Sequence, residues 1–431
     1  MVSDRPQRPS LPPPVARDPS RPTALDGVRV VDFTHFIAGP YATMMLADFG
    51  ADVIKIESAE DGDGFRNYPP YLGDESVPYL WANRGKRSVG LDLKSAAGRE
   101  IALQLAASAD IVIENFSTGV MQRLRLDYEA VRAHNPEVIY CSVSSYGRHG
   151  PFANRIGFDP VVQAESGFMA MNGFPEREPV RAGPSMMDIS TALMTCNALL
   201  AAVVARQRTG QGQYIETTMI ETAINLLGNF SLAYLSTGES PSRFGNVQTT
   251  AAPVGTFETM DGQIYLACAN DRTFQRLATE VLGMPELVSD LRFAGSAARR
   301  ENRQTLMDKI AEVFRDQPRT QLLARMHEAG VPAGAVRSVG EALNGPEIAH
   351  LGLLSEIPHR SLGTVPNVGL PIHMSGTPLA DPVGAPPLGA DTDQVLRDLL
   401  GLSDSQLAEL AAQGALGAAR RASHSGPQSG S

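Results

Sequence analysis

Short apolar stretches alternate with amphipathic ones along the first third of the chain. Residues 28–33 and 52–57 have the pattern of buried strands, and the segment between them, residues 40–50, is helical in pattern, with Pro40 at its start and Gly50 at its end. The alternation continues with strands at 87–93, 111–116 and 138–146 and with helices at 94–110 and 119–136. Strands that alternate with helices in this way predict a parallel sheet covered on both faces.

The pattern changes in the second half of the chain. Helices dominate from residue 160 to about 235, around a strand at 213–219, and a long polar connection follows. A hairpin is predicted at 255–270, with Asp261-Gly262 at its turn. It is followed by helices near 272–283, 301–315 and 318–329, by a strand at 333–338 and by a last amphipathic helix near 403–413. The middle of this half therefore predicts a smaller α+β domain.

The two ends of the chain differ from the rest. Residues 1–22 hold seven prolines and no apolar segment of the kind found in signal peptides. We therefore expect a flexible, Pro-rich extension over residues 1–24 rather than a secretory leader. The last residues, 416–431, are small and polar and predict a disordered tail.

Composition excludes several classes of function. The 37 basic and 47 acidic residues give a net charge of -10, which argues against a protein that binds nucleic acid or an anionic membrane. No uninterrupted apolar run of about 18 residues is present, so no membrane span is expected. Three distant cysteines and eight scattered histidines suggest neither a disulfide framework nor a metal site, and a reducing cytoplasm is the expected location.

Three loops have the composition of an anion site. Residues 34–40 follow the first strand and lead into a helix, residues 82–88 carry Arg84 and two further cations, and residues 115–123 follow another strand and end in Arg123. Ligands of parallel sheets bind beyond the carboxyl ends of strands, where helix N-termini expose N–H groups. No GxGxxG follows the first strand, so a dinucleotide dehydrogenase is disfavoured.

Asp188 is the one charge that precedes a long apolar run, 189–205. Aspartate is a favoured N-cap residue, so a capping role explains its position. The same position suits a nucleophile, because a helix end favours the carboxylate while apolar neighbours such as Met187 and Ile189 remove water from it. We expect the helix end to keep it ionised near neutral pH, and the two roles are compatible.

The chain resembles the class III CoA-transferases, which include formyl-CoA:oxalate and succinyl-CoA:dicarboxylate CoA-transferases. The resemblance covers residues 25 to about 415. It rests on these segments: "LDGVRVVDFTHFIAGPYATMMLADFGADVIKIE", "NRGKRSVGLDLKSAAGRE", "ADIVIENFSTGVMQRLRLDYE", "NPEVIYCSVSSYGRHGP", "GFDPVVQAESGFMAMNG", "GPSMMDISTALM", "VGTFETMDGQIYLACAND" and "EAGVPAGAV".

The resemblance implies an architecture. It predicts an α/β fold in which a Rossmann-like large domain is built from N- and C-terminal parts, beside a smaller α+β domain, in a homodimer of interlocked, ring-like chains. The expected divisions are the extension 1–24, the large CoA-binding domain 25–220, a linker 221–250, the small domain 251–345, a linker and returning C-terminal part 346–415, and the tail 416–431.

The resemblance also implies the chemistry. Asp188 stands at the position of the family's catalytic aspartate, which forms an acyl anhydride and then a thioester with CoA while CoA passes from an acyl-CoA to a carboxylic acid. Coenzyme A is then a substrate, and no prosthetic group or metal is required. The residues that match the family's CoA contacts are Ile37, Ala38, Ala82, Asn83, Arg84, Gly85, Asn115, Phe116, Ser117, Arg123, Tyr146 and Gly147.

Departures from the family's patterns reduce the range of candidate acceptors and reactions. Ser58 and Ser144 replace basic residues of the oxalate-type members, and their "GGGGQ" loop is absent, which favours another acceptor, such as a small dicarboxylate. The related acyl-CoA racemases pair their aspartate with the histidine of "GHD", where this chain has Phe158, which cannot exchange a proton. A racemase or epimerase and a non-catalytic CoA-binding protein remain the alternatives. His35, Arg181 and Arg243 are further candidates for contact with substrate.

Overall fold

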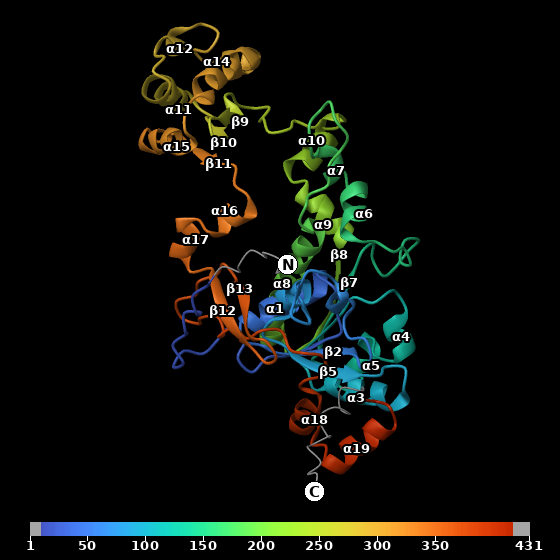
Figure 1. Ribbon diagram of the computed structural model, residues 1–431. Coiled ribbons are helices and arrows are strands. Elements are labelled where there is room, and N and C mark those ends of the chain that lie inside the picture. Colours follow the sequence, from blue (N-terminus) through green and yellow to red (C-terminus); the bar gives the residue numbers. More distant parts are fainter. Residues whose placement is uncertain (1–9, 417–431) are drawn as a thin grey trace, which may run out of the picture. The chain divides into compact units, whose positions relative to one another are not determined.

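The computed structural model describes residues 10–416 of the 431-residue chain. The chain divides into two compact units. The larger unit combines the chain up to Ser166 with Gly183–Gly228 and with the segment from Glu347 onward, and the smaller unit consists of Gly167–Ala182 and Asn229–Pro346. Figure 1 is coloured along the sequence, and its blue and red segments, which come from opposite ends of the chain, both belong to the larger unit.

A six-stranded parallel sheet forms the centre of the larger unit. Its strands are β1 (Arg29–Asp32), β2 (Asp52–Ser58), β5 (Arg87–Leu91), β6 (Ile111–Glu114), β7 (Ile139–Ser144) and β8 (Gln213–Thr218). Their order is β5-β2-β1-β6-β7-β8, and every neighbouring pair is parallel. The α/β class with a parallel central sheet is therefore confirmed.

Helices cover both faces of this sheet. Successive side chains of a strand point to opposite faces, so neighbouring strand residues pack into different apolar clusters. Val30 packs with α1 (Ala38–Asp48) and α8 (Met186–Thr209) in one apolar cluster, and Val31 packs into the other. The second cluster includes side chains from α3 (Ala96–Ala107), α4 (Val120–Leu124), α5 (Tyr128–Arg132), α18 (Thr392–Leu400) and α19 (Asp404–Ala412). Near-continuous apolar strands are the consequence of burial on both faces.

The single helix expected at 119–136 is wrong in one respect, because it is divided into α4 and α5. Arg125 has a φ of 58°, in the left-handed region, which ends α4. Asp127 then caps α5, where its carboxylate accepts hydrogen bonds from the backbone N–H groups of Glu129 (3.1 Å) and Ala130 (3.3 Å). An amphipathic period continues across such a break, so periodicity alone does not reveal it.

Residues 10–24 differ from the flexible extension that the sequence predicted. The backbone N–H of Glu356 donates to the carbonyl of Pro12 (2.8 Å), and the backbone N–H of Arg17 donates to Asp381 (3.0 Å). The extension therefore lies against the C-terminal segment of the larger unit. Residues 1–9 lie outside the described residues, as do residues 417–431 of the tail that was expected at 416–431. Its first residue, Leu416, pairs with Leu91 at the end of β5.

The smaller unit is built around an antiparallel sheet. Its strands are β9 (Val254–Thr259), β10 (Gly262–Ala267) and β11 (Ala333–Ala335). The expected hairpin is present, but Gly262 already pairs with Thr259, so the two turn residues are Met260 and Asp261. The helices of this unit are α7 (Phe168–Met171), α10 (Asn229–Thr237), α11 (Asp271–Arg276), a π-helical turn (Leu277–Val281), α12 (Glu286–Ser289), α13 (Ser296–Glu301), α14 (Arg303–Arg315), α15 (Arg319–Glu328) and α16 (Val339–Leu343).

Several short elements complete the larger unit. They are a 3₁₀ turn (Gly64–Asn67), β3 (Tyr71–Leu72), β4 (Glu75–Ser76), α2 (Val77–Asn83), α6 (Asp159–Glu165), α9 (Met219–Leu226), α17 (Pro346–Leu351), β12 (Leu354–His359) and β13 (Gly363–Val368). Helices α9 and α10 occupy much of the stretch 221–250 that was expected as a linker.

Candidate active site

The order of the strands identifies the edge of the sheet at which a ligand is expected. From β1 the chain continues to β2 and β5 on one side, and from β6 it continues to β7 and β8 on the other. The topological switch point therefore lies between β1 and β6. In parallel α/β sheets, ligands bind beyond the carboxyl ends of the strands at this point.

The loops that follow β1 and β6 are joined directly. The side-chain amide of Asn115 donates to the carbonyl of His35 (2.9 Å), and its oxygen accepts from the backbone N–H of the same residue (2.8 Å). The rings of His35 and Phe116 meet edge to face, with centroids 5.0 Å apart. Two of the predicted loops, with Ile37 and Ala38 in one and Asn115 and Phe116 in the other, are therefore brought together.

Buried charges hold the first of these loops in an unusual conformation. The ammonium of Lys55 donates to the carbonyl of Thr34 (2.6 Å), and the carboxylate of Asp63 accepts from the backbone N–H of Phe36 (3.1 Å). Lys55 and Asp63 are themselves paired at 2.9 Å with both side chains fully buried. Phe36 has a φ of 65°, a conformation that is strained for an aromatic residue, and these contacts fix it.

The loop after β7 brings Tyr146 and Gly147 to the same edge of the sheet. The hydroxyl of Tyr146 donates to Glu165 of α6 (2.6 Å), and the guanidinium of Arg155 lies over its ring at 4.7 Å. The backbone N–H of Gly147 donates to the hydroxyl of Ser144 (3.0 Å), with a φ of 95° that favours glycine.

Arg148 is a residue of this edge that sequence reasoning missed. Its guanidinium contacts the carboxylate of Glu114 (3.0 Å), the hydroxyl of Ser142 (2.6 Å) and the carbonyl of Phe116 (2.5 Å), while its backbone N–H donates to Glu216 (2.5 Å). It thereby ties together the ends of β6, β7 and β8. A single arginine in "YGRHG" carries no sequence signal for this role.

The placement of Ala82–Gly85 differs from expectation. This segment precedes β5 instead of following a strand, so the prediction that it lies beyond a carboxyl end is wrong. Ala82, Asn83 and Arg84 are buried, and the guanidinium of Arg84 makes two bonds to the carboxylate of Asp48, at 3.1 and 2.5 Å. Burial raises the pKa of Asp48 even though Arg84 opposes the shift.

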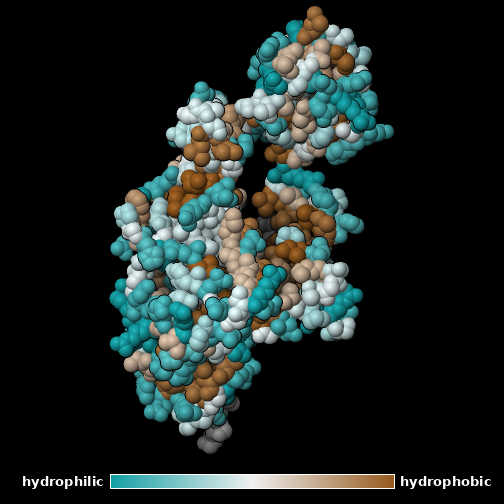
Figure 2. Space-filling view, turned by 180° about the vertical axis from the view of Figure 1, so that it is seen from behind, coloured by the Kyte–Doolittle hydropathy of each residue, from teal (hydrophilic) through white to brown (hydrophobic). Residues whose placement is uncertain are grey.

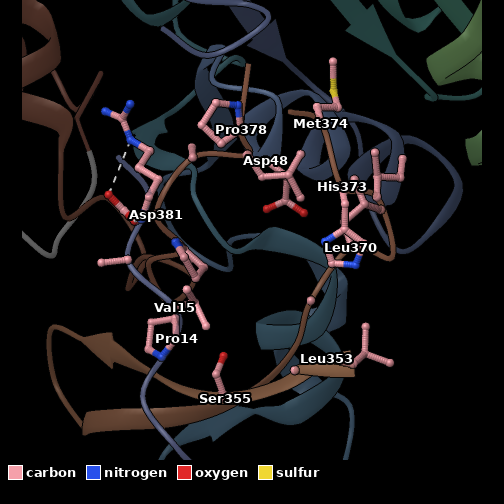
Figure 3. A pocket seen from close by; sticks show the side chains of 18 of the residues that line it. Pro14, Val15, Asp48, Leu353, Ser355, Leu370, His373, Met374, Pro378 and Asp381 are labelled. Atoms are coloured by element: carbon pink, nitrogen blue, oxygen red, sulfur yellow. Dashed lines mark hydrogen bonds and ion pairs between the residues drawn. The ribbon is translucent and has the colours of Figure 1, made fainter. Parts of the chain in front are cut away.

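Asp48 and Arg84 lie on the wall of a cavity of about 620 Å³, which the extension and the C-terminal segment also line. Figure 3 shows the Asp48 carboxylate pointing into this cavity, with His373 beside it and Ser355 of β12 on another wall. Asp48 is the last residue of α1, a helix that begins after the carboxyl end of β1, so this cavity is not at the switch point.

The remaining predicted contacts are at the surface. Ser117 is exposed, and Arg123 is exposed on α4, where a Cβ added to Gly119 would come within 3.1 Å of its guanidinium. Lys94 is an exposed cation three residues beyond β5, at the carboxyl edge, and was not among the predicted contacts. Its position directly after a predicted strand was a signal that could have found it.

The start of α8 lies at the same edge. Arg206, near the end of α8, contacts Asp110 and the carbonyl of Glu137, which come just before β6 and β7, so the helix ends at the amino edge of the sheet. Its first turn, with Asp188, therefore points towards the carboxyl edge. There it contacts α6, the helix that follows the β7 loop.

Asp188 is not the N-cap of α8. The helix begins at Met186, so Asp188 is its third residue, and Ser185 at the N-cap makes no side-chain cap. The cap comes from α6, because one carboxylate oxygen of Asp159 accepts from the backbone N–H groups of Met187 (2.7 Å) and Asp188 (3.3 Å). The capping role considered for Asp188 thus belongs to Asp159, which leaves the Asp188 side chain available for chemistry.

The ionisation of Asp188 also differs from expectation. Burial, followed by the negative charge of Asp159, raises the pKa of Asp188 from 3.8 to about 7. The helix end does not hold the carboxyl fully ionised near neutral pH, since the N–H groups of the first turn are already bonded to Asp159. Perturbed acids of this kind gather at functional sites.

Arg181 and Arg243 belong to the smaller unit. The Arg243 guanidinium is bonded to the carbonyls of Ala170, Phe174, Pro175 and Arg177, so its donors are engaged within that unit. Arg181 is exposed and donates to the carbonyl of Ala182 (3.3 Å). Over residues 10–416, no three His, Cys, Asp or Glu side chains gather as a metal site.

Comparison with known proteins gives a consistent result. A family model described as CoA-transferase family III matches residues 25–392. The chain is 37% identical over 388 residues to a succinate–glutarate CoA-transferase of Agrobacterium fabrum, covering 88% of this chain and 97% of the relative. It is also 37% identical to an acetyl-CoA:oxalate CoA-transferase of Acetobacter aceti, covering 83% of this chain and 91% of the relative.

A solved structure agrees with these matches. The crystal structure of a CAIB/BAIF family protein from Brucella suis superposes with a TM-score of 0.81 at 36% identity, covering 88% of this chain and all of the other. The similarity therefore extends through both units of the fold.

Proposed function

The chain belongs to CoA-transferase family III, and we propose that it moves CoA from an acyl-CoA to a carboxylic acid through covalent intermediates on Asp188. The observation that carries this proposal is the state of the Asp188 carboxyl group. It is half-buried at the carboxyl edge of the sheet and has a pKa of about 7, and it does not cap α8, because Asp159 does so.

This environment suits a nucleophilic carboxylate. Only the ionised form attacks, and a carboxylate of higher pKa is the stronger nucleophile once it is ionised. Burial removes the water that would solvate and weaken it. A pKa near 7 leaves a substantial ionised fraction at neutral pH and predicts that the rate rises with pH through that range.

The proposed reaction has four balanced steps. The Asp188 carboxylate attacks the acyl carbon of the donor, the C–S bond breaks, and an aspartyl anhydride and a free CoA thiolate result. The thiolate attacks the aspartyl carbonyl, which releases the donor acid and leaves an aspartyl-CoA thioester. The acceptor carboxylate attacks this thioester and expels the thiolate, giving a second anhydride. The thiolate then attacks the acceptor's acyl carbon, which releases the new acyl-CoA and the Asp188 carboxylate.

Coenzyme A takes part in this reaction only as a substrate, and the steps require no prosthetic group. We propose that CoA enters across the switch point, against the joined loops that contain Ile37, Ala38, Asn115 and Phe116. The exposed cations Arg123 and Lys94, at the same edge, are the proposed partners of its phosphates.

We propose a small dicarboxylate as the acceptor. The Agrobacterium fabrum relative is named for succinate and glutarate, and a Haloarcula hispanica relative, 37% identical over 376 residues, is named for succinyl-CoA and mesaconate. The Acetobacter aceti relative is named for oxalate, so oxalate should be tested as an acceptor beside the dicarboxylates glutarate and mesaconate.

The decisive experiment follows the covalent intermediates. Wild type is incubated with succinyl-CoA, its intact mass is recorded, and a panel of acids is then added and new thioesters are identified. We expect an adduct that hydroxylamine removes, CoA transfer to a dicarboxylate, and loss of both, by at least about 10³-fold, in Asp188→Ala. Asp188→Ala should still bind CoA, because no predicted CoA contact is altered.

Two outcomes would contradict the proposal. Transfer at the wild-type rate by Asp188→Ala would remove Asp188 from the reaction. Solvent deuterium incorporated at the α-carbon of an acyl-CoA, without exchange of CoA between acids, would instead identify a racemase or epimerase.

A further inference from the structure

Asp159 is the residue that joins the two helices at this edge of the sheet. It stands in the first turn of α6 and is only 4% exposed. One of its oxygens accepts from the N–H groups of Met187 (2.7 Å) and Asp188 (3.3 Å), and the other accepts from the side-chain amide of Gln163 (2.6 Å). A carboxylate from one helix thus caps another.

This arrangement determines where the first turn of α8 lies. Ser185 makes no side-chain cap, so the bonds from Asp159 replace the cap that the sequence of α8 does not supply. Gln163 is fully buried and fixes the rotation of the Asp159 carboxylate. The position of the Asp188 backbone relative to the β7 loop therefore depends on α6.

The same bonds change the electrostatics around Asp188. A helix N-terminus ordinarily stabilises a nearby anion through its unpaired N–H groups. Here those of Met187 and Asp188 are directed at Asp159 instead. Asp188 is left beside a second negative charge, and two neighbouring carboxylates disfavour simultaneous ionisation.

We infer that Asp159 is a positioning residue of the transfer reaction, which holds the first turn of α8 in place and keeps Asp188 a strong nucleophile by occupying the helix donors and by its own charge. This inference rests on the proposed function, in which Asp188 forms the covalent intermediates. It goes beyond that function because it assigns the reactivity of the nucleophile to a second, buried residue on another helix.

Other charges do not explain the state of Asp188. After burial, the negative charge of Asp159 is the cause that raises the pKa of Asp188. The remaining acidic groups on the elements packed against α8 have partners of their own. They are Asp48 of α1, bonded to Arg84; Glu165 of α6, bonded to Tyr146 and Arg155; Glu216 of β8, bonded to the Arg148 backbone; and Glu221 of α9, bonded to Thr218.

The test measures the rate of adduct formation on succinyl-CoA as a function of pH, by intact mass, in wild type, Asp159→Asn and Asp159→Glu. Asparagine keeps an oxygen that accepts from the helix donors but removes the charge. We expect the acid limb of the Asp159→Asn profile to move to lower pH by about one unit. The plateau rate should fall, because the ionised Asp188 is then less basic. Asp159→Glu should restore the wild-type pH dependence, even at a reduced rate.

Asp127→Asn is the matched control, because Asp127 also caps a helix, α5, through two backbone N–H groups. Its substitution removes a capping charge elsewhere in the same unit and should leave the acid limb unchanged. A merely structural role of Asp159 would lower the rate at every pH without moving that limb.

The outcomes separate the two proposals. An adduct that is absent from Asp188→Ala, together with identical acid limbs in wild type and Asp159→Asn, would overturn this inference and leave the proposed function standing. An adduct that persists in Asp188→Ala would overturn the proposed function, and the inference with it. If Asp159→Asn does not fold, a wild-type acid limb in Asp159→Glu supports the role of the charge, and a shifted limb contradicts it.

Discussion

Asp159 and Asp188 are the same residue type in contact across two helices, and their surroundings assign them different roles. Asp159 is buried and accepts three hydrogen bonds, whereas Asp188 is half-buried and has a pKa of about 7. The difference arises from which of the two carboxylates receives the donors of the first turn of α8. A residue's place in a helix therefore does not by itself determine its ionisation.

The raised pKa of Asp188 predicts a cost in stability at high pH. The folded state holds the Asp188 proton more tightly than the unfolded state does, so the contribution of this one group to stability is greatest below pH 4 and is lost as the pH rises through about 7. Asp188→Asn removes this cost and should stabilise the protein at pH 8, on the order of 2 kcal/mol after allowance for partial exposure. Thermal or urea unfolding at pH 4.5 and pH 8 measures it.

The gain should be small at pH 4.5, where wild-type Asp188 is protonated when folded. An equal gain at both values of pH would show that Asp188 ionises normally in the folded protein. Such a trade of stability for activity is common at active sites.

At the scale of elements, the ends of β6, β7 and β8 depend on one arginine. Arg148 pairs with Glu114, which is 5% exposed, and bonds to the carbonyl of Phe116 in a predicted CoA loop. Burial raises the pKa of Glu114 although Arg148 opposes the shift. The ion pair is therefore one in which removal of a single partner leaves a buried charge without compensation.

Arg148→Met should destabilise the protein by about 3 kcal/mol at pH 8, measured by urea unfolding. The loss should be smaller at pH 5.5, because Glu114 without its arginine becomes protonated when folded. The double variant Arg148→Met, Glu114→Gln should recover part of the stability at pH 8. A loss that is independent of pH, with no recovery in the double variant, would contradict this account of the pair.

At the scale of the whole molecule, the notable feature is α8, a long apolar helix that is buried on only one side. It is the one helix within the described residues that is long and apolar enough to cross a membrane, with half of its most apolar window buried. That buried side packs against the sheet and α1. The core helix of a soluble protein meets the same criteria, so α8 is only weak support for a membrane span.

The other side of α8 is apolar and exposed. Leu193, Met194 and Val204 are exposed on α8, and Ile224 and Leu226 are exposed on α9, which packs beside it. Figure 2 shows hydrophobic residues gathered in patches on the surface of the larger unit. Apolar patches of this kind mark interaction sites. We therefore propose a second copy of this chain as the partner of this surface, in line with the homodimer that the family resemblance implies.

Leu193→Asp should then shift the protein from dimer to monomer, measured by light scattering during gel filtration. Leu291→Asp is the matched control, because Leu291 is 89% exposed in the smaller unit and outside this surface, and it should remain dimeric. A wild-type protein that is monomeric at micromolar concentration would contradict the proposal before either variant is made.

The strands and most helices could be predicted from the sequence, because apolar periodicity follows directly from burial on one or two faces. The family could be identified, since its segments follow one another in order along the chain. The site could be predicted only in part. The resemblance implied Asn115 and Phe116 as CoA contacts, and in the structure they directly follow β6. The sequence misplaced Ala82–Gly85, which precedes β5, because a cationic loop looks the same before a strand as after it.

The sequence by itself determined the parallel sheet, the family and the choice of Asp188, because each depends on local pattern or on residues in a fixed order. Only the tertiary structure decided that Asp159 makes the cap of α8, that Arg84 is bonded to Asp48, and that Arg148 joins three strands. These contacts join residues up to 68 positions apart, the separation between Arg148 and Glu216. Which donor meets which carboxylate depends on the packing of whole elements, and that packing also sets the dielectric surroundings from which each pKa follows.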